Sequence, residues 1–170
     1  YWLSCMRACR EVRPCPMQSL ARDCTVLAPL GGYVMTTSID GRWLRDGWPQ
    51  DFVLELHGSL RRLQCSEPCS DDSWDMPRDL GLEEAPASGN AVGPLPKCPR
   101  CGAVARPCVR MGEDDAAFVG SRAQHVPAQE EAMYNRVEWC RGPSIVCLEL
   151  GGTGRAPAYW EDLERRVAGF

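Results

Sequence analysis

Two close pairs of cysteines are the residues whose spacing indicates a chemistry most clearly. Cys65 and Cys69 lie in CSEPC, and Cys98 and Cys101 lie in CPRCG, with a long loop-rich stretch between the pairs. Two such pairs can place four thiolates tetrahedrally around one zinc ion, and Gly102 allows the tight turn after the second pair. The metal then supplies folding energy that a loop-rich segment cannot gain from an apolar core. The spacing therefore predicts a structural zinc site, because four thiolates leave no open position for a substrate.

Two alternatives compete with the zinc site. A redox pair at Cys98 and Cys101 would leave the first pair without a role, and a chance coincidence is possible in a chain with 11 cysteines. Cys108 is a further possible ligand. Because the cysteine count is odd and no export signal is visible, we expect free thiols and metal ligands in the cytoplasm or another reducing intracellular compartment.

Three other positions could carry chemistry. His57 follows an apolar run and precedes Gly58-Ser59; its imidazole suits proton transfer, although a histidine hydrogen-bonded at a strand end is an equally good interpretation. Asp40 in SIDG could accept a hydrogen bond from a ligand or cap its own turn, and the pattern favours the turn. The loop 151–154 (GGTG) could let the backbone approach a phosphate, but a full dinucleotide fingerprint is absent.

Three apolar runs are expected to position these residues as strands. They cover Tyr33–Thr37, Phe52–Leu56 and Ser144–Leu150, and each ends in a polar or glycine-rich turn. The carboxyl ends of parallel strands form the ligand-binding edge of an open sheet. The pattern therefore predicts that Asp40, His57 and Gly151 lie along one edge.

Helices are expected in three other parts of the chain. We predict two short helices within residues 1–30, a helix over Ala128–Trp139, and a helix from Pro157 to Val167. With the strand and glycine loop before it, the last helix makes half of a nucleotide-binding α/β unit. Residues 71–96 lack periodicity and are expected to form a long excursion between the cysteine pairs.

Composition limits the classes of function. In 170 residues, 44% apolar content is enough for a core, and no apolar run reaches the length of a membrane span. The net charge of −4 argues against a general nucleic-acid or anionic-membrane binder, which needs a cationic surface. Residues 61–110 are electrically balanced, so a zinc ribbon for nucleic acid is disfavoured. We expect neither nucleic acid nor membrane as a direct partner.

The order of the motifs resembles the sirtuin family of NAD-dependent protein deacylases. TTSIDG, LELHGSLRRLQC, LPKCPRCGAVARPCVRMGEDD and IVCLELGGTG follow one another as in that family, and QCSEPCSDDSW is similar to a bacterial-type branch. The resemblance covers nearly all of the chain from about Tyr33. It implies an NAD-dependent protein-lysine deacylase that transfers the acyl group from lysine to the ADP-ribose of NAD and releases nicotinamide.

The resemblance also implies a fold class and a domain organisation. The class is α/β, with an incomplete Rossmann-like parallel sheet with helices and an inserted four-cysteine zinc-ribbon module. Residues 1–60 and 111–170 would form the NAD-binding domain, and residues 61–110 the zinc module. An acylated lysine of a protein or peptide would enter the cleft between them.

Individual roles are implied only where the motifs match. His57 matches the general base that acts on a ribose hydroxyl, and Val109 lies in the segment that runs alongside the substrate peptide. The expected cofactor is NAD, with a zinc ion as structural metal. The implied zinc ligands are Cys65, Cys69, Cys98 and Cys101, and the implied NAD contacts are Ser38 and Asp40 on the nicotinamide side and Gly151, Gly152 and Thr153 on the adenosine side.

Three departures from the family pattern qualify these roles. Ser38 stands where the family has an asparagine, and a hydroxyl cannot reproduce the paired donor and acceptor of an amide. Met111-Gly112-Glu113 lacks the usual aromatic residue, and no Gly-Ala-Gly-x-Ser loop occurs. Because Tyr1 falls after the expected place of that loop, we expect an N-terminally truncated member. The alternative function is a catalytically impaired sirtuin-like zinc protein that binds only NAD metabolites or protein partners.

Overall fold

The computed structural model describes residues 15–26, 32–77, 79–120, 125–139 and 146–151, together with Leu3, Arg7, Glu161 and Arg165. The chain divides into two compact units, Tyr1–Gln129 and Glu130–Phe170. Among these residues, no helix combines the length and apolar character needed to cross a bilayer.

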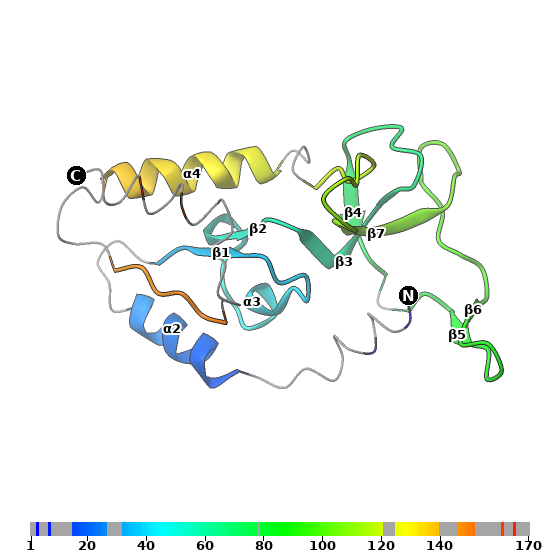
Figure 1. Ribbon diagram of the computed structural model, residues 1–170, viewed down its shortest axis with the longest axis horizontal. Helices are drawn as coiled ribbons and strands as arrows, with labels where there is room; N and C mark the ends of the chain where they lie inside the picture. Colours follow the sequence, from blue (N-terminus) through cyan, green and yellow to red (C-terminus); the bar gives the residue numbers. More distant parts are fainter. Residues whose placement is uncertain are drawn as a thin grey trace. The chain divides into compact units, whose positions relative to one another are not determined.

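The first unit contains a short parallel strand pair. Strands β1 (Val34–Thr36) and β2 (Val53–Glu55) lie side by side in Figure 1, with Val34 opposite Val53 and Thr36 opposite Glu55. The Leu56 N–H donates to the Thr36 carbonyl oxygen at 2.9 Å, which extends the pairing by one step. These strands confirm the first two predicted runs. Because the strands are parallel, the segments that follow them leave from the same edge.

A small apolar cluster packs against this pair. Val34, Trp48 and Val53 are buried, and partly buried side chains surround them. The rings of Trp43 and Trp48 meet edge to face with centroids 5.6 Å apart, a favoured geometry for aromatic pairs. The short helix α3 (Arg42–Arg45) contributes Trp43 and Leu44 to this cluster.

Helix α2 (Pro16–Val26) confirms a helix in the N-terminal region, and Leu3 and Arg7 are helical as well. Proline suits the first helical position, because its missing N–H would have no partner there. Arg22 donates to the backbone oxygen of Asp46 at 2.6 Å and so ties α2 to the end of α3.

An antiparallel sheet follows the parallel pair. Its strand order is β4 (Ser73–Asp75), β3 (Gly58–Cys65) and β7 (Ala105–Val109). Beyond β4, the strands β5 (Glu83–Glu84) and β6 (Ala91–Val92) form an exposed two-residue pairing, visible as a separate small hairpin in Figure 1. The excursion is therefore irregular for most of its length, as predicted, with two short pairings that the sequence did not indicate.

The predicted α/β class with a separate cysteine-bearing module is confirmed. Helices accompany a parallel strand pair, and the four cysteines gather in the region of the antiparallel sheet. Helix α4 (His125–Trp139) confirms the predicted helix and begins three residues earlier. Two hydrogen bonds within the first unit hold Gln129. The Tyr33 hydroxyl donates to its backbone oxygen at 2.7 Å, and its side-chain Nε2 donates to the backbone oxygen of Gln50 at 2.7 Å.

The third predicted strand is wrong over the part that the structure describes. Residues 146–150 have no regular secondary structure, and the side chains of Val146 and Leu148 are 91% and 62% exposed. An apolar run becomes a strand only when a neighbouring strand supplies backbone partners, and none of the described strands pairs with it. The helix predicted from Pro157 lies mostly outside the described residues; Glu161 and Arg165 are helical.

Candidate functional site

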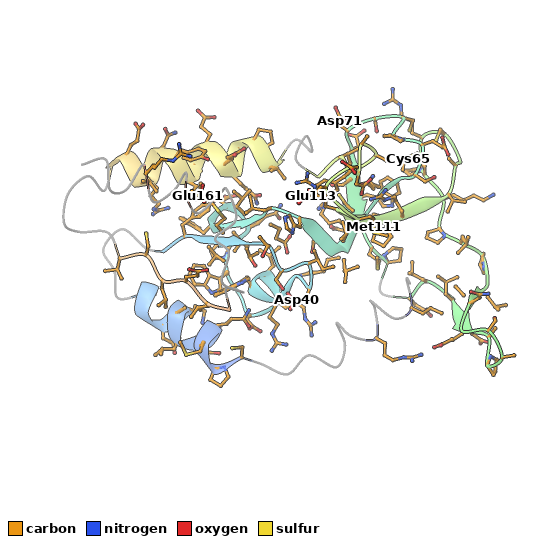
Figure 2. The ribbon with its side chains drawn as sticks, in the orientation of Figure 1. Asp40, Cys65, Asp71, Met111, Glu113 and Glu161 are labelled. Carbon is orange, nitrogen blue, oxygen red and sulfur yellow. The ribbon has the colours of Figure 1, made fainter. Side chains whose placement is uncertain are left out.

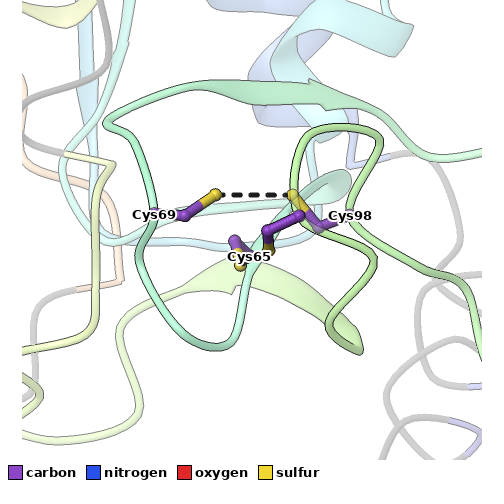
Figure 3. A group of neighbouring side chains, drawn as sticks. Cys65, Cys69 and Cys98 are labelled. Atoms are coloured by element: carbon purple, nitrogen blue, oxygen red, sulfur yellow. Dashed lines mark hydrogen bonds between the residues drawn. The ribbon is translucent and has the colours of Figure 1, made fainter.

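The four predicted zinc ligands come together. Cys65 ends β3, Cys69 lies in the turn after it, and Cys98 and Cys101 come from the turn that precedes β7. Their sulfur atoms all lie within 4.8 Å of one another. Figure 3 shows three of the side chains converging from two loops, with the Cys69 and Cys98 sulfurs joined by a dashed line.

The sulfur spacing fits a tetrahedral zinc ion. The Sγ atoms of Cys65 and Cys101 are 3.5 Å apart, and those of Cys69 and Cys98 are 3.7 Å apart. A zinc–sulfur bond of about 2.3 Å places neighbouring sulfurs of a tetrahedron about 3.8 Å apart. Both separations are far too long for a disulfide, and all four cysteines are free. The donor set and the spacing are therefore those of a structural zinc site.

Backbone hydrogen bonds hold the second cysteine turn in place. The Cys98 N–H donates to the Ala103 oxygen at 2.7 Å, and the Gly102 N–H donates to the Cys98 oxygen at 3.0 Å. Gly102 has a φ of +76°, the left-handed region in which glycine is preferred, so the tight turn expected from CPRCG is present. The Ser66 N–H donates to the Val104 oxygen at 3.1 Å and joins the two turns.

The electrostatics of the cysteines suit metal binding. A backbone N–H of Cys101 pointing at the Cys98 sulfur lowers the pKa of Cys98 to about 7, which favours the thiolate that binds metals. Burial, together with the neighbouring thiols, raises the pKa of Cys69 to about 12. A bound divalent ion reverses that second effect, because its charge stabilises every thiolate around it.

The structure favours the zinc site over the redox pair and over Cys108 as a ligand. The sulfur contacts of 3.5 Å and 3.7 Å join one cysteine of each pair, Cys65 with Cys101 and Cys69 with Cys98, as expected for four ligands of one ion, whereas a redox pair would involve Cys98 and Cys101 alone. Cys108 is buried on β7 and lies outside the four-sulfur cluster. Burial raises the pKa of its thiol to about 11, so it is held as the neutral form.

His57 lies in the turn between β2 and β3, half-buried. Its backbone oxygen accepts the Arg110 N–H at 3.0 Å, which fixes the turn against the end of β7. Among the described residues its imidazole has no hydrogen-bond partner. Burial, and then the positive charge of Arg110, lower the pKa of His57 below 6.5, so the ring is neutral at pH 7 and able to accept a proton.

Gly58 is required by a close approach of two backbones. It has a φ of +76°, and a Cβ atom at this position would lie 2.0 Å from the Cys108 carbonyl oxygen. Gly58 pairs with Val109 in the sheet, so the residue after His57 sits directly against β7. Val109, predicted to border the substrate, is 1% exposed, and its carbonyl oxygen accepts a hydrogen bond from Arg106 at 2.8 Å.

The segment after β1 meets the same turn. The Leu60 N–H donates to the Ile39 oxygen at 2.8 Å, which brings residues 38–41 beside the start of β3. Asp40, labelled in Figure 2, accepts the Arg42 N–H at Oδ1 at 2.9 Å, so the turn role favoured for it is confirmed. The described contacts leave its Oδ2 atom for another donor. Ser38 is exposed, and its N–H donates to the Thr36 hydroxyl at 3.0 Å.

The loop after β7 is tied to the sheet. Arg106 forms an ion pair with Asp115, and Asp115 Oδ2 also accepts the Met111 N–H at 2.9 Å. The Arg106 guanidinium first, and then the Met111 N–H, hold the pKa of Asp115 below its usual value. Figure 2 labels Met111 and Glu113 on this loop. Asp115 therefore ties this loop to β7 through Arg106.

Glu55 was missed as a site residue. It ends β2, and burial raises the pKa of its carboxyl group to about 7, while a hydrogen bond from the Ser59 side chain acts in the opposite direction. The only signal in the sequence was an acid at the end of an apolar strand, two residues before His57.

The glycine loop is described only at its first residue. Gly151 has a φ of +78° and is exposed, with nothing within 4 Å of an added Cβ atom. Gly152 and Thr153 lie outside the described residues. The structure therefore brings Asp40 and His57 to adjacent segments, and the predicted adenosine-side contacts remain predictions.

Similar proteins were found in two of three comparisons, and no protein-family model matches the chain. A probable bifunctional ADP-ribose hydrolase/ADP-ribosyltransferase from Fusarium oxysporum f. sp. cubense is 31% identical over 147 residues, which cover 81% of this chain and 24% of that protein. NAD-dependent protein deacylase 2 from Pseudomonas aeruginosa is 36% identical over 83 residues, which cover 48% of this chain and 28% of that protein. The chain thus spans about a quarter of the length of these curated relatives.

Solved structures of Sir2 homologues are also similar in part. A Sir2 homolog–NAD complex has a TM-score of 0.41 at 24% identity and covers 70% of this chain and 38% of that one. A mutant Sir2 homologue bound to ADP-ribose has a TM-score of 0.42 at 24% identity and covers 71% and 39%. Over the 48% of the chain that aligns, the sequence is similar to an NAD-dependent protein deacylase.

Proposed function

We propose that the chain carries the zinc-binding part and the histidine loop of an NAD-dependent protein-lysine deacylase of the sirtuin type. One observation supports this most directly: the neutral, half-buried His57 imidazole has its backbone fixed by β7 and no hydrogen-bond partner among the described residues. A base needs these two properties, a fixed position and a free nitrogen at neutral pH.

The domain roles in this proposal are those that the sequence motifs imply. Residues 1–60 and 111–170 would serve NAD, and residues 61–110 would form the zinc module. On the nicotinamide side, Asp40 offers its second carboxylate oxygen and Ser38 an exposed hydroxyl. Gly151, Gly152 and Thr153 would contact the adenosine side. When bound, NAD supplies the activated bond between ribose and nicotinamide, and His57 accepts a proton at an imidazole nitrogen.

The zinc ion has a structural role in this proposal. Cys65, Cys69, Cys98 and Cys101 would supply four thiolates and close its coordination shell. Val109 would border an acylated lysine of a protein or peptide substrate through its backbone, because its side chain is buried.

ADP-ribosyl transfer is a second candidate. The relative that aligns with 81% of this chain is named as an ADP-ribose hydrolase and ADP-ribosyltransferase. Both candidates release nicotinamide from NAD and differ in the acceptor, so one assay with two product readouts separates them.

The test uses the zinc-loaded chain, NAD and an acetyl-lysine peptide. Nicotinamide release and peptide mass are measured for the wild type, for His57→Ala, and for His125→Ala as a matched control at the other histidine. Loss of a general base lowers the rate by about 100-fold or more. We expect that loss for His57→Ala, with unchanged zinc content, and a rate close to wild type for His125→Ala.

Each other outcome has a definite meaning. Robust deacylation by His57→Ala would refute the assignment of the base. Nicotinamide release with transfer of ADP-ribose to protein, and no deacylated peptide, would favour the transferase. Calorimetric binding of NAD without any turnover would favour the impaired sirtuin-like protein, for which the replacement of an asparagine by Ser38 is the motivating observation.

A further inference from the structure

We propose that Arg106, held in place by Asp115, closes the outer edge of β7 and must leave the Val109 oxygen before an extended peptide can pair with that strand. The outer edge is the side of β7 that faces away from β3. The inference rests on the proposed function in one respect, that the substrate is a peptide. It gives a role to two residues for which the sequence motifs implied none.

Val109 turns its backbone polar groups away from β3. It lies opposite Gly58, and the hydrogen bond beside this pair runs from the Arg110 N–H to the His57 oxygen at 3.0 Å. When the residues next to a facing antiparallel pair make the bond, the pair itself directs its N–H and C=O groups to the other sides of the strands. Among the described strands β7 is the last in the order β4-β3-β7, so the Val109 oxygen points to the outer edge.

The rest of the outer edge offers less to an incoming strand. The Ala105 N–H donates to the Pro96 oxygen at 2.8 Å, and Pro107 has no N–H to donate. An exposed edge strand can pair with another chain, and a proline or a charged side chain on the edge prevents this. Along the described length of β7, Val109 is therefore where we expect an added strand to pair.

The Val109 oxygen already has a partner. The Arg106 guanidinium donates to it at 2.8 Å, and the whole Val109 residue is 1% exposed. Because the residue is almost completely covered, the N–H of an added strand cannot reach this oxygen while the guanidinium is in place. A peptide therefore bonds with Val109 only after Arg106 has moved.

Asp115 holds Arg106 in this position. The two side chains form an ion pair through both terminal nitrogens of the guanidinium, with Nη1 and Oδ1 3.0 Å apart, and Oδ2 also accepts the Met111 N–H at 2.9 Å. The side chains of Arg106 and Asp115 are only 19% and 9% exposed, so salt screens the pair little. Asp115 thus joins the guanidinium to the backbone of the loop on which Figure 2 labels Met111.

The test measures how tightly the zinc-loaded chain binds an acetyl-lysine peptide, by fluorescence anisotropy, and its KM for that peptide. The variant is Arg106→Met/Asp115→Asn, which removes the ion pair, keeps the net charge and leaves no buried charge without a partner. We expect it to bind the peptide about 10-fold more tightly, the factor for one hydrogen bond from a charged donor, because that bond no longer has to break. The KM for NAD should change by less than about 2-fold.

A second ion pair in the same sheet provides the matched control. Arg62 and Asp75 are 3.1 Å apart on β3 and β4, away from the outer edge of β7. Arg62→Met/Asp75→Asn should leave the peptide affinity within about 2-fold of wild type. In both double variants the zinc content and the NMR ring signals of His57 should match the wild type. Damage to the fold would lower the affinity, so it cannot produce the expected gain.

A modified peptide tests whether the gain comes from pairing with the backbone. Methyl groups on the backbone nitrogens next to the acetyl-lysine remove the N–H groups that would donate to the Val109 oxygen. The affinity of this peptide should therefore not increase in Arg106→Met/Asp115→Asn.

The outcomes separate this inference from the proposed function. If the wild type deacylates the peptide but Arg106→Met/Asp115→Asn binds it no more tightly, the function stands and the inference is wrong. If no form deacylates the peptide but the variant binds it more tightly, the inference stands without the function. An equal gain for the N-methylated peptide, or no binding of either peptide by any form, would overturn the inference.

Discussion

At the residue scale, Gly58 shows how closely β7 approaches the His57 turn. Any side chain here meets the Cys108 carbonyl oxygen at 2.0 Å, and its φ of +76° is strained for other residues. Gly58→Ala should therefore lower the free energy of unfolding by about 3 kcal/mol or more, from backbone strain together with the clash. Denaturant unfolding of the zinc-loaded chain measures this.

Gly81→Ala is the matched control for that change. Gly81 has a φ of +60°, but a Cβ atom there meets nothing within 4 Å, so the variant isolates the cost of the backbone conformation at about 1 kcal/mol. Equal losses in the two variants would contradict the close approach of β7.

The raised pKa of Glu55 makes the free energy of unfolding depend on pH. Its pKa in the folded protein is about 7, above the ordinary value of 4.5, so between these values the folded state holds a proton that the unfolded state releases. Stability therefore falls as pH rises from about 4.5 to about 7 and then levels off. Glu55→Gln lacks this proton, so its stability relative to wild type should increase from pH 5 to pH 8 by about 1–3 kcal/mol.

The measurement is the difference in the free energy of unfolding between Glu55→Gln and the wild type at each pH, under saturating zinc. Effects of pH on the metal site act on both proteins alike and cancel in the difference. A constant difference from pH 5 to pH 8 would show that Glu55 ionises with an ordinary pKa.

The clustering of the four cysteines could be predicted from the sequence, whereas the burial of Glu55 could not. The spacing of two cysteine pairs limits how their sulfurs can be arranged, so it carries information about a site before any fold is known. The pKa of Glu55 depends on burial between segments that are far apart in the sequence. The role of Asp40, in its own turn or toward a ligand, was also left open by the sequence. In the structure one carboxylate oxygen accepts a hydrogen bond within its own turn, and the other is left for a second donor.

At the element scale, a buried glutamine attaches the loop after β7 to β3. The Gln64 side chain is 0% exposed; its Nε2 donates to the Ala117 oxygen at 2.5 Å, and its Oε1 accepts the Val119 N–H at 3.1 Å. Gln64→Leu would leave two backbone groups without partners in an interior position. We expect a loss of about 2–4 kcal/mol in the free energy of unfolding.

Amide exchange identifies the origin of that loss. The Val119 amide should exchange faster in Gln64→Leu, while Gln50→Leu, a change at an exposed side chain, should alter neither stability nor the Val119 exchange rate by a measurable amount. Unchanged protection of Val119 in Gln64→Leu would argue against the attachment.

The same glutamine explains why strand β3 was not predicted. Ser59, Arg61, Arg62 and Gln64 interrupt its apolar residues, yet Ser59 and Gln64 are buried because their polar atoms have partners elsewhere in the fold. Residues 146–150 show the opposite case. Their apolar run predicted a strand, but they pair with none of the described strands. Strand formation depends on neighbours that a local pattern does not contain.

At the scale of the whole molecule, β3 connects the metal centre to the histidine turn. The strand begins at Gly58, immediately after His57, and ends at Cys65, and β7 pairs with both of its ends, with a register shift between Ser59 and Leu63. The buried apolar clusters in the described part are small, so we expect a metal bound by the four cysteines to contribute much of the folding free energy of this region. On the proposed function, such an ion would support the geometry of His57 without contacting it.

Removal of zinc should therefore disorder the His57 turn as well as the cysteine loops. We expect one zinc per chain, and loss of β3 and β7 amide protection together with a change in the His57 ring signals when a chelator removes the metal; added zinc should restore both. Cys98→Ser should reproduce the metal-free state, whereas Cys15→Ser, at an exposed cysteine outside the cluster, should retain the zinc. Because β3 is continuous from one site to the other, unchanged His57 signals in the metal-free protein would mean that the parallel strand pair alone holds the turn.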